Sequence, residues 1–104
     1  DLAAARGDTI GAIRAQREAV RIWEGLRLEA PGPGTEIAWF DSQLLLVEAL
    51  LVQNDEPTLA AEATQLLQTL RDYSQQHAQT LQARPDLIQE LGRLQRRASS
   101  KETR

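Results

Sequence analysis

Apolar residues recur at steps of three and four along most of the chain, which is the spacing that places side chains on one face of an α-helix. The first such stripe consists of Ala12, Ala15, Ala19, Ile22, Leu26 and Ala30, and three further residues widen it: Ile13, Val20 and Trp23. We expect this helix to begin at Asp8, whose carboxylate can accept hydrogen bonds from the free N–H groups of the first turn. We expect it to end at the Pro-Gly-Pro-Gly run of residues 31–34, because proline cannot continue the hydrogen-bond ladder.

The next segment, which starts near Thr35 and Glu36, contains the most apolar part of the chain, LLLVEALLV at residues 44–52. One stripe at helical spacing comprises Ile37, Phe40, Leu44, Val47 and Leu51, and most of the remaining circumference is filled by Leu45, Leu46, Ala49, Leu50 and Val52. The pattern is too long for a typical strand. It is too short to span a bilayer, which takes about 20 apolar residues. A helix that is apolar nearly all round is covered on more than one side, so we predict a central core helix.

Two more helices are predicted towards the C-terminus. After the turn Asn54-Asp55-Glu56-Pro57, helical spacing continues to about Gln82 through Leu59, Ala63, Leu66, Leu70, Tyr73, His77 and Leu81. The turn Arg84-Pro85-Asp86 is followed by a short last helix with Leu87, Leu91, Leu94 and Ala98. Residues 99–104 include no apolar residue, and we expect a frayed tail there. The sequence therefore predicts an all-α domain over residues 1–98, with about four helices.

Composition narrows the function classes. The chain has 104 residues, enough for one domain, and a net charge of −3. This charge argues against a nucleic-acid partner, because nucleic-acid binding needs a cationic face that displaces counterions. No basic segment leads into an apolar one as in a signal peptide, and we expect a cytoplasmic protein without membrane contact. The chain begins at Asp1 and contains no methionine, so we expect it to be the C-terminal piece of a larger protein.

Two segments resemble each other: AAARGDTIGAIRAQREAV at residues 3–20 and ALLVQNDEPTLAAEATQLL at residues 49–67. In both, a helix end runs into Gly-Asp or Asn-Asp, and an alanine-rich helix follows. The first segment, with Gly7-Asp8, Ala12-Ile13 and Ala19-Val20, resembles the tetratricopeptide repeat. In that family the glycine makes a turn, and small residues let neighbouring helices approach closely. The second copy departs from the pattern, since Asn54 replaces the glycine and Pro57 follows.

The resemblance implies antiparallel helical hairpins stacked into a right-handed superhelix. It divides the chain into a partial first repeat at residues 1–30, a second repeat at 36–82 and a closing helix at 85–98. The offset between Gly7 and Asn54 is 47 residues, longer than the family's usual 34, as in extended variants of bacterial multidomain proteins. The function it implies is a protein–protein interaction scaffold. The alternative is an oligomerisation or structural module of a larger bacterial signalling or regulatory protein.

The register of the resemblance places Glu48 on the surface that faces the concave groove of such an array. With Asp41 two turns earlier, Glu48 would line a groove that selects a basic or amide-rich peptide. The residues expected to contact the partner are Asp41, Leu44, Glu48, Leu51 and Val52. The alternative for Glu48 is a half-buried carboxylate paired with Arg14 or Arg21, since an unpaired buried charge is costly.

The incomplete first repeat suggests a second contact surface. If the helix that would cover them is missing, then Ile10, Ile13 or Val20 would be exposed and would favour self-association into a homo-oligomer.

Catalytic chemistry is not indicated. His77 is the single histidine and there is no cysteine, so no second ligand of either type could share a metal with it. Ser74 or Thr80 could be a nucleophile beside His77, but residues on successive turns of one helix do not form an oriented triad with an oxyanion hole. We expect a non-catalytic protein with no cofactor and no metal. The basic C-terminus, with Arg93, Arg96, Arg97, Lys101 and Arg104, suits the helix dipole, and a phosphate-binding tail is the alternative.

Overall fold

Helices form all the regular secondary structure of the computed structural model, which describes residues 2–52 and 56–102, with side chains described over 10–52 and 56–99. In chain order they are α1 (Leu2–Glu29), α2 (Pro33–Val52), α3 (Pro57–Gln76), α4 (Ala78–Leu81) and α5 (Pro85–Glu102). The all-α prediction is confirmed. In the described part of the chain, no helix is both long enough and apolar enough to cross a membrane.

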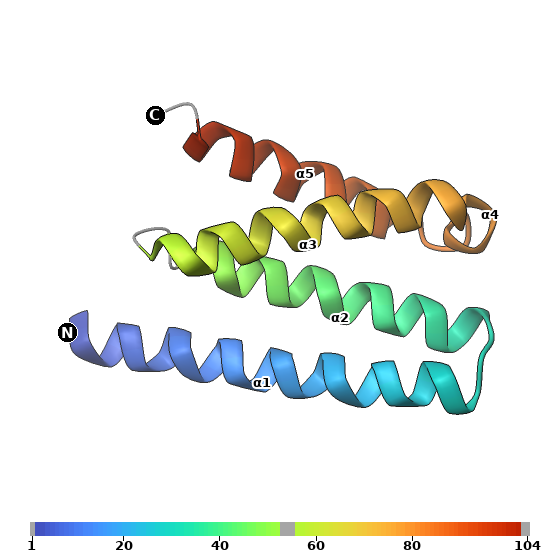
Figure 1. Ribbon diagram of the computed structural model, residues 1–104, viewed down its shortest axis with the longest axis horizontal. Helices are drawn as coiled ribbons and strands as arrows, with labels where there is room; N and C mark the ends of the chain where they lie inside the picture. Colours follow the sequence, from blue (N-terminus) through green and yellow to red (C-terminus); the bar gives the residue numbers. More distant parts are fainter. Residues whose placement is uncertain (1, 53–55, 103–104) are drawn as a thin grey trace.

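The long helices run side by side, and each is antiparallel to the one before it (Figure 1). As a result α5 runs in the same direction as α2 (Figure 1). Helix α2 lies in the middle and packs against α1, α3, α4 and α5. Among the described residues, α1 packs closely against α2 alone and forms one edge of the row.

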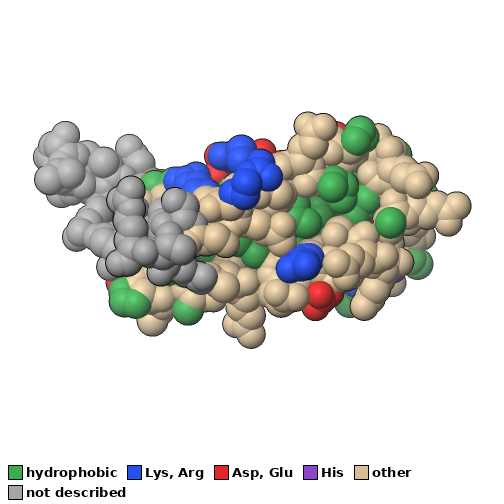
Figure 2. Space-filling view, turned by 90° about the horizontal axis from the view of Figure 1, so that it is seen from above, with side chains coloured by type: hydrophobic (Ala, Val, Ile, Leu, Met, Phe, Trp, Pro, Cys, Tyr) green, Lys and Arg blue, Asp and Glu red, His purple; other side chains and the backbone are tan. Residues whose placement is uncertain are grey.

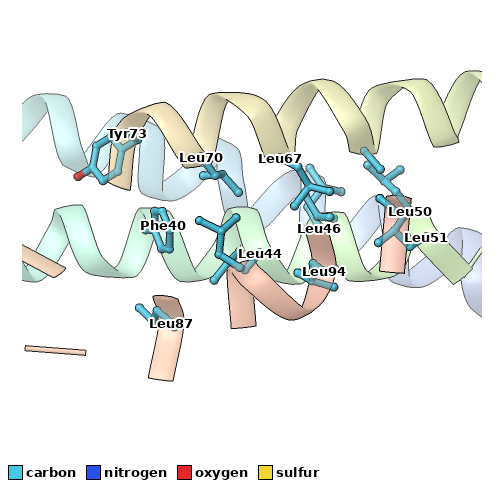
Figure 3. Close-up of a cluster of buried hydrophobic side chains, with 14 of the residues drawn as sticks. Phe40, Leu44, Leu46, Leu50, Leu51, Leu67, Leu70, Tyr73, Leu87 and Leu94 are labelled. Atoms are coloured by element: carbon cyan, nitrogen blue, oxygen red, sulfur yellow. The ribbon is translucent and has the colours of Figure 1, made fainter. Parts of the chain in front are cut away.

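The core is built around α2, as the apolar circumference of that helix predicted. Phe40, Val47 and Leu50 have no exposed surface, and Leu44 is 2% exposed. Figure 3 shows the α2 side chains of Phe40, Leu44 and Leu50 between two sets of apolar side chains: Leu67, Leu70 and Tyr73 of α3 on one side, and Leu87 and Leu94 of α5 on the other. Because each buried leucine or phenylalanine is worth about 1.5–3 kcal/mol of transfer free energy, this contact layer holds the helices together.

The helix boundaries follow from local chemistry. Helix α2 begins at Pro33, two residues before the expected start, because proline suits the first helical position, where its missing N–H is no loss. Thr35 supports this turn through its Oγ1, which donates to the carbonyls of Ala30 and Gly32 at 2.9 and 3.1 Å. Pro57 likewise opens α3, where the Glu56 carboxylate accepts from the N–H of Thr58. The single helix expected up to Gln82 is interrupted at His77, which ends α3.

Two expected helix ends are wrong. Helix α1 begins at Leu2 and runs through Gly7 and Asp8, so Asp8 does not start the helix and Gly7-Asp8 makes no turn. A glycine inside a helix costs only about 1 kcal/mol, and the alanines around it are the best helix formers. The matching turn residues Asn54 and Asp55 lie outside the described residues. Helix α5 continues to Glu102, past the expected end at Ala98, because no glycine or proline follows Gly92 to stop it.

Candidate functional site

A surface hollow of about 310 Å³ lies where the start of α5 runs beside the middle of α2. Its lining comes from α2, from the turn before α5 and from the first turns of α5, and consists of Asp41, Leu44, Leu45, Glu48, Arg84, Asp86, Leu87 and Glu90. Three leucines therefore meet four carboxylates and one arginine in one place. Such a surface offers an apolar contact bordered by negative charge.

The helical period places these residues together. Leu44 and Leu45 are each three or four residues from both Asp41 and Glu48, so the four side chains share one face of α2. Asp86 and Glu90 are likewise one turn apart on α5. Helices α2 and α5 run in the same direction (Figure 1), and each contributes two carboxylates to the lining of the hollow.

Two arginines neutralise part of this charge. Arg84 donates two hydrogen bonds to Asp86, at 3.0 and 2.9 Å, and these bonds lower the pKa of that carboxyl. Arg93 donates to Glu90, which lowers the pKa of Glu90, and its Nη2 also lies 3.5 Å from an oxygen of Glu48. Asp41 makes no hydrogen bond or ion pair with any residue whose side chain is described, and its charge acts on Arg84 only through space. With four carboxylates and two arginines (4 − 2 = 2), the hollow keeps an excess of two negative charges.

Three of the five predicted partner-contacting residues, Asp41, Leu44 and Glu48, lie together on the hollow. The other two do not line it. Leu51 is buried in the core at 3% exposure, and Val52, at the end of α2, is 52% exposed.

The predicted arginine partners of Glu48 are wrong. Glu48 pairs with Arg93 of α5, whereas Arg21 pairs with Glu18 on its own helix at 2.5 Å. Sequence reasoning also missed the α5 side of the hollow, formed by Arg84, Asp86, Leu87 and Glu90. The one-turn spacing of Asp86 and Glu90 beside Leu87 was a signal for an acidic, amphipathic helix start.

The predicted self-association residues are mostly covered. Ile13 is 7% exposed and Val20 packs against the core, so both face α2 and are not free; Ile10 is 50% exposed. Helix α1 instead leaves much of the first predicted stripe in solvent. Ala12 and Ala15 are exposed, Ile22 is 48% exposed and Leu26 is 38% exposed.

A second cluster joins α1, α2 and α3 through a stacked cation. The guanidinium of Arg27 lies 4.2 Å from the ring centre of Trp39, and its Nε is 3.3 Å from an oxygen of Glu36. The Tyr73 hydroxyl donates to the other oxygen of Glu36, and burial together with this bond raises the pKa of Tyr73. The Tyr73 ring also stacks on His77, with ring centres 4.2 Å apart. Because Arg27 fills the space over the Trp39 ring, we interpret the cluster as a structural joint.

No group of three or more histidine or acidic residues among the described positions is close enough to hold a metal ion. In the view from the α5 side, a patch of hydrophobic side chains lies beside basic side chains that have acidic ones next to them (Figure 2). Comparisons with family models, with curated proteins and with solved structures found no match to this chain.

Proposed function

We propose that the chain is a non-catalytic interaction module that binds a basic, leucine-containing segment of a partner protein in the hollow between α2 and α5. One observation carries the proposal: Asp41, which forms no ion pair with the described side chains, borders an apolar floor together with three other carboxylates. A lysine or arginine of the partner would pair with Asp41, and an adjacent apolar side chain would cover Leu45. Leu45 is 45% exposed, so its burial adds to the binding free energy.

The size of the hollow suits a segment of chain and not a large cofactor. A volume of 310 Å³ lies at the low end of the roughly 300–1,000 Å³ that small-molecule pockets span. The walls come from helices held by the core, so the receptor loses little conformational freedom on binding. Since the charge is at the surface, salt should weaken the interaction.

The arrangement of two ion pairs supports a stacked-hairpin scaffold behind this site. Arg17 of α1 pairs with Glu62 of α3, 45 residues later, at 2.5 and 2.7 Å. Glu48 of α2 pairs with Arg93 of α5, which is also 45 residues later (93 − 48 = 45). Both pairs join long helices that are two apart in chain order, as expected if the hairpins α1–α2 and α3–α5 are stacked in a tetratricopeptide-like array. This grouping differs from the one given by the sequence resemblance, in which residues 36–82 form a single repeat. We propose this array as the scaffold that fixes the distance between the α2 and α5 walls.

The test compares two variants that lose the same charge. The probe is a fluorescein-labelled synthetic peptide with leucine and arginine at helical spacing, and its affinity is measured by fluorescence polarisation. Asp41→Asn should weaken binding about fivefold, since a partly desolvated charge contact is worth about 1 kcal/mol. Asp72→Asn is the control, because Asp72 is exposed on α3, outside the hollow, and accepts a hydrogen bond from Gln68 of its own helix. Equal loss in both variants, or in neither, would count against the hollow as the binding site.

A further inference from the structure

Near the C-terminal end of α5, a serine follows two adjacent arginines. Arg96 and Arg97 stand three and two residues before Ser99. Ser74 and Ser100 each have a single arginine among the three residues before them. Serine kinases that select basic substrates pair the guanidinium groups before the acceptor serine with carboxylates of their own cleft. The arginine pattern therefore fits such a kinase better at Ser99 than at the other two serines.

The structure exposes Ser99 and holds Ser74 in place. Ser74 is partly buried, and its hydroxyl donates to the carbonyl of Arg71 at 2.7 Å. It also follows Tyr73, which is 8% exposed and belongs to the core. Ser99 is exposed, and its hydroxyl forms no hydrogen bond within the described part of the chain. Of these two serines, Ser99 is the one that an enzyme can reach.

The two arginines before Ser99 are available as well. Neither Arg96 nor Arg97 forms an ion pair with a residue whose side chain is described, whereas Arg93, one turn earlier, is held by two carboxylates. Arg96 is exposed, and its guanidinium reaches back over Gly92, where an added Cβ would meet it at 3.4 Å. A kinase that binds Arg96 and Arg97 therefore breaks no ion pair with the described side chains.

The end of α5 can open at little cost. A kinase reads the residues before its acceptor serine along an extended segment, so this part of the helix must unwind. Helix α5 ends at Glu102, three residues after Ser99, and its end lies at the periphery of the molecule (Figure 1). After Leu94, the one buried residue of α5 among the described side chains is Ala98. An alanine buries little apolar area, so unwinding the last turns sacrifices little packing.

We propose that Ser99 is a phosphorylation site for a serine kinase that selects arginine before its acceptor. The Oγ of Ser99 attacks the γ-phosphorus of ATP, the bond between this phosphorus and the oxygen bridging the β- and γ-phosphates breaks, and ADP leaves. The catalytic base of the kinase takes the hydroxyl proton. The product carries a charge of about −1.5 to −2 at pH 7 in place of a neutral hydroxyl. Because the C-terminal end of a helix is itself partially negative, the phosphate favours the opened form of the last turns.

Phosphorylation of the purified chain provides the first test, with the catalytic subunit of cyclic-AMP-dependent protein kinase and ATP as the probe. The wild-type chain should take up about one phosphate, which mass spectrometry should locate on Ser99. Ser99→Ala should abolish this uptake. Ser74→Ala is the matched control and should keep it, because the Ser74 hydroxyl is bound within α3. No uptake by the wild-type chain, or phosphate on Ser74 or Ser100 instead, would overturn the proposal.

Arginine variants test which side chains the kinase reads. Arg96→Ala and Arg97→Ala should each lower kcat/KM for the chain by about tenfold or more, since each removes a charge-assisted contact with the kinase. Arg71→Ala is the matched control, because Arg71 is exposed on α3 and precedes the inaccessible Ser74. An equal loss in all three variants, or in none, would contradict recognition through the arginines before Ser99.

Amide hydrogen exchange tests the opening of the helix end. The amides of residues 97–102 should exchange at least about tenfold faster than those of residues 88–94, which include the buried Leu91 and Leu94. Equal protection of the two stretches would show that the last turns open only together with the rest of α5, and would contradict access of the kinase to Ser99.

The phosphorylation site goes beyond the proposed function and can fail separately from it. No residue that lines the hollow lies beyond Glu90 in the chain, so Ser99→Ala should leave the affinity for the arginine–leucine peptide unchanged. A changed affinity in this variant would overturn the placement of the modification outside the binding surface. A chain that binds the peptide but takes up no phosphate would sink the phosphorylation site alone.

Discussion

Two leucines on α2, five residues apart, should differ sharply in their contribution to stability. Leu50 has no exposed surface, whereas Leu45 is 45% exposed. Leu50→Ala removes three buried carbon groups, worth about 0.8 kcal/mol each, and leaves a cavity in the core, so we expect a loss of about 3–4 kcal/mol. Leu45→Ala removes the same atoms from a half-solvated position and leaves no cavity, so we expect a loss below about 1 kcal/mol.

Urea denaturation followed by circular dichroism measures both losses. For a domain of this size the slope m is about 1–2 kcal/mol per molar urea, so Leu50→Ala should lower the midpoint by about 2 M with an unchanged slope. The Leu45→Ala midpoint should move by less than about 0.5 M. An equal or larger loss for Leu45→Ala would show that the other face of α2 is buried, and would refute the packing described above.

Two further predictions concern titrating contacts. A double-mutant cycle with Arg17→Gln and Glu62→Gln at pH 7 should give a coupling free energy of about 0.5–1 kcal/mol for this ion pair. The hydrogen bond from Arg17 lowers the pKa of Glu62 below 4.5, so the coupling should be present above pH 4.5 and should vanish as the pH falls through the lowered pKa. A coupling that is unchanged at about pH 2 would contradict the contact. Tyr73, the sole tyrosine, has a raised pKa because of its burial and its hydrogen bond to Glu36. Its contribution to folding stability should therefore be present below pH 10 and be lost as the pH rises through the raised pKa. Ultraviolet absorbance should show no phenolate in the folded chain at about pH 11, and the normal titration of an exposed phenol would contradict the burial of Tyr73.

Much of the fold could be predicted because helical spacing is a local property. The core role of α2 followed from apolar residues around nearly its whole circumference, which no exposed helix would carry. Which face of α1 is buried could not be predicted in this way. Its two adjacent stripes share the same spacing, and the position of α2 decides that Ile13 and Val20 are covered while Ile22 is not. The turn expected at Gly7-Asp8 was wrong because a glycine lowers helix stability only slightly, and good helix formers next to it offset that loss.

The candidate site was predictable on one side only. The seven-residue spacing of Asp41 and Glu48 places both on one face of a helix, and the structure shows both on the hollow. The facing wall comes from residues 84–90, a separate segment of the chain, and nothing local in the sequence pairs Glu48 with Arg93. Tertiary packing alone brings these two residues together, so the choice of Arg14 or Arg21 as the partner of Glu48 was wrong.

The central claim is that the acidic hollow between α2 and α5 is the binding surface of this chain. The most direct measurement compares the affinity of the arginine–leucine peptide for Asp41→Asn and for Asp72→Asn at low salt. The proposed function predicts a loss of about fivefold for Asp41→Asn and no loss for Asp72→Asn. If both variants bind the peptide as tightly as the wild-type chain, the hollow is not the binding surface.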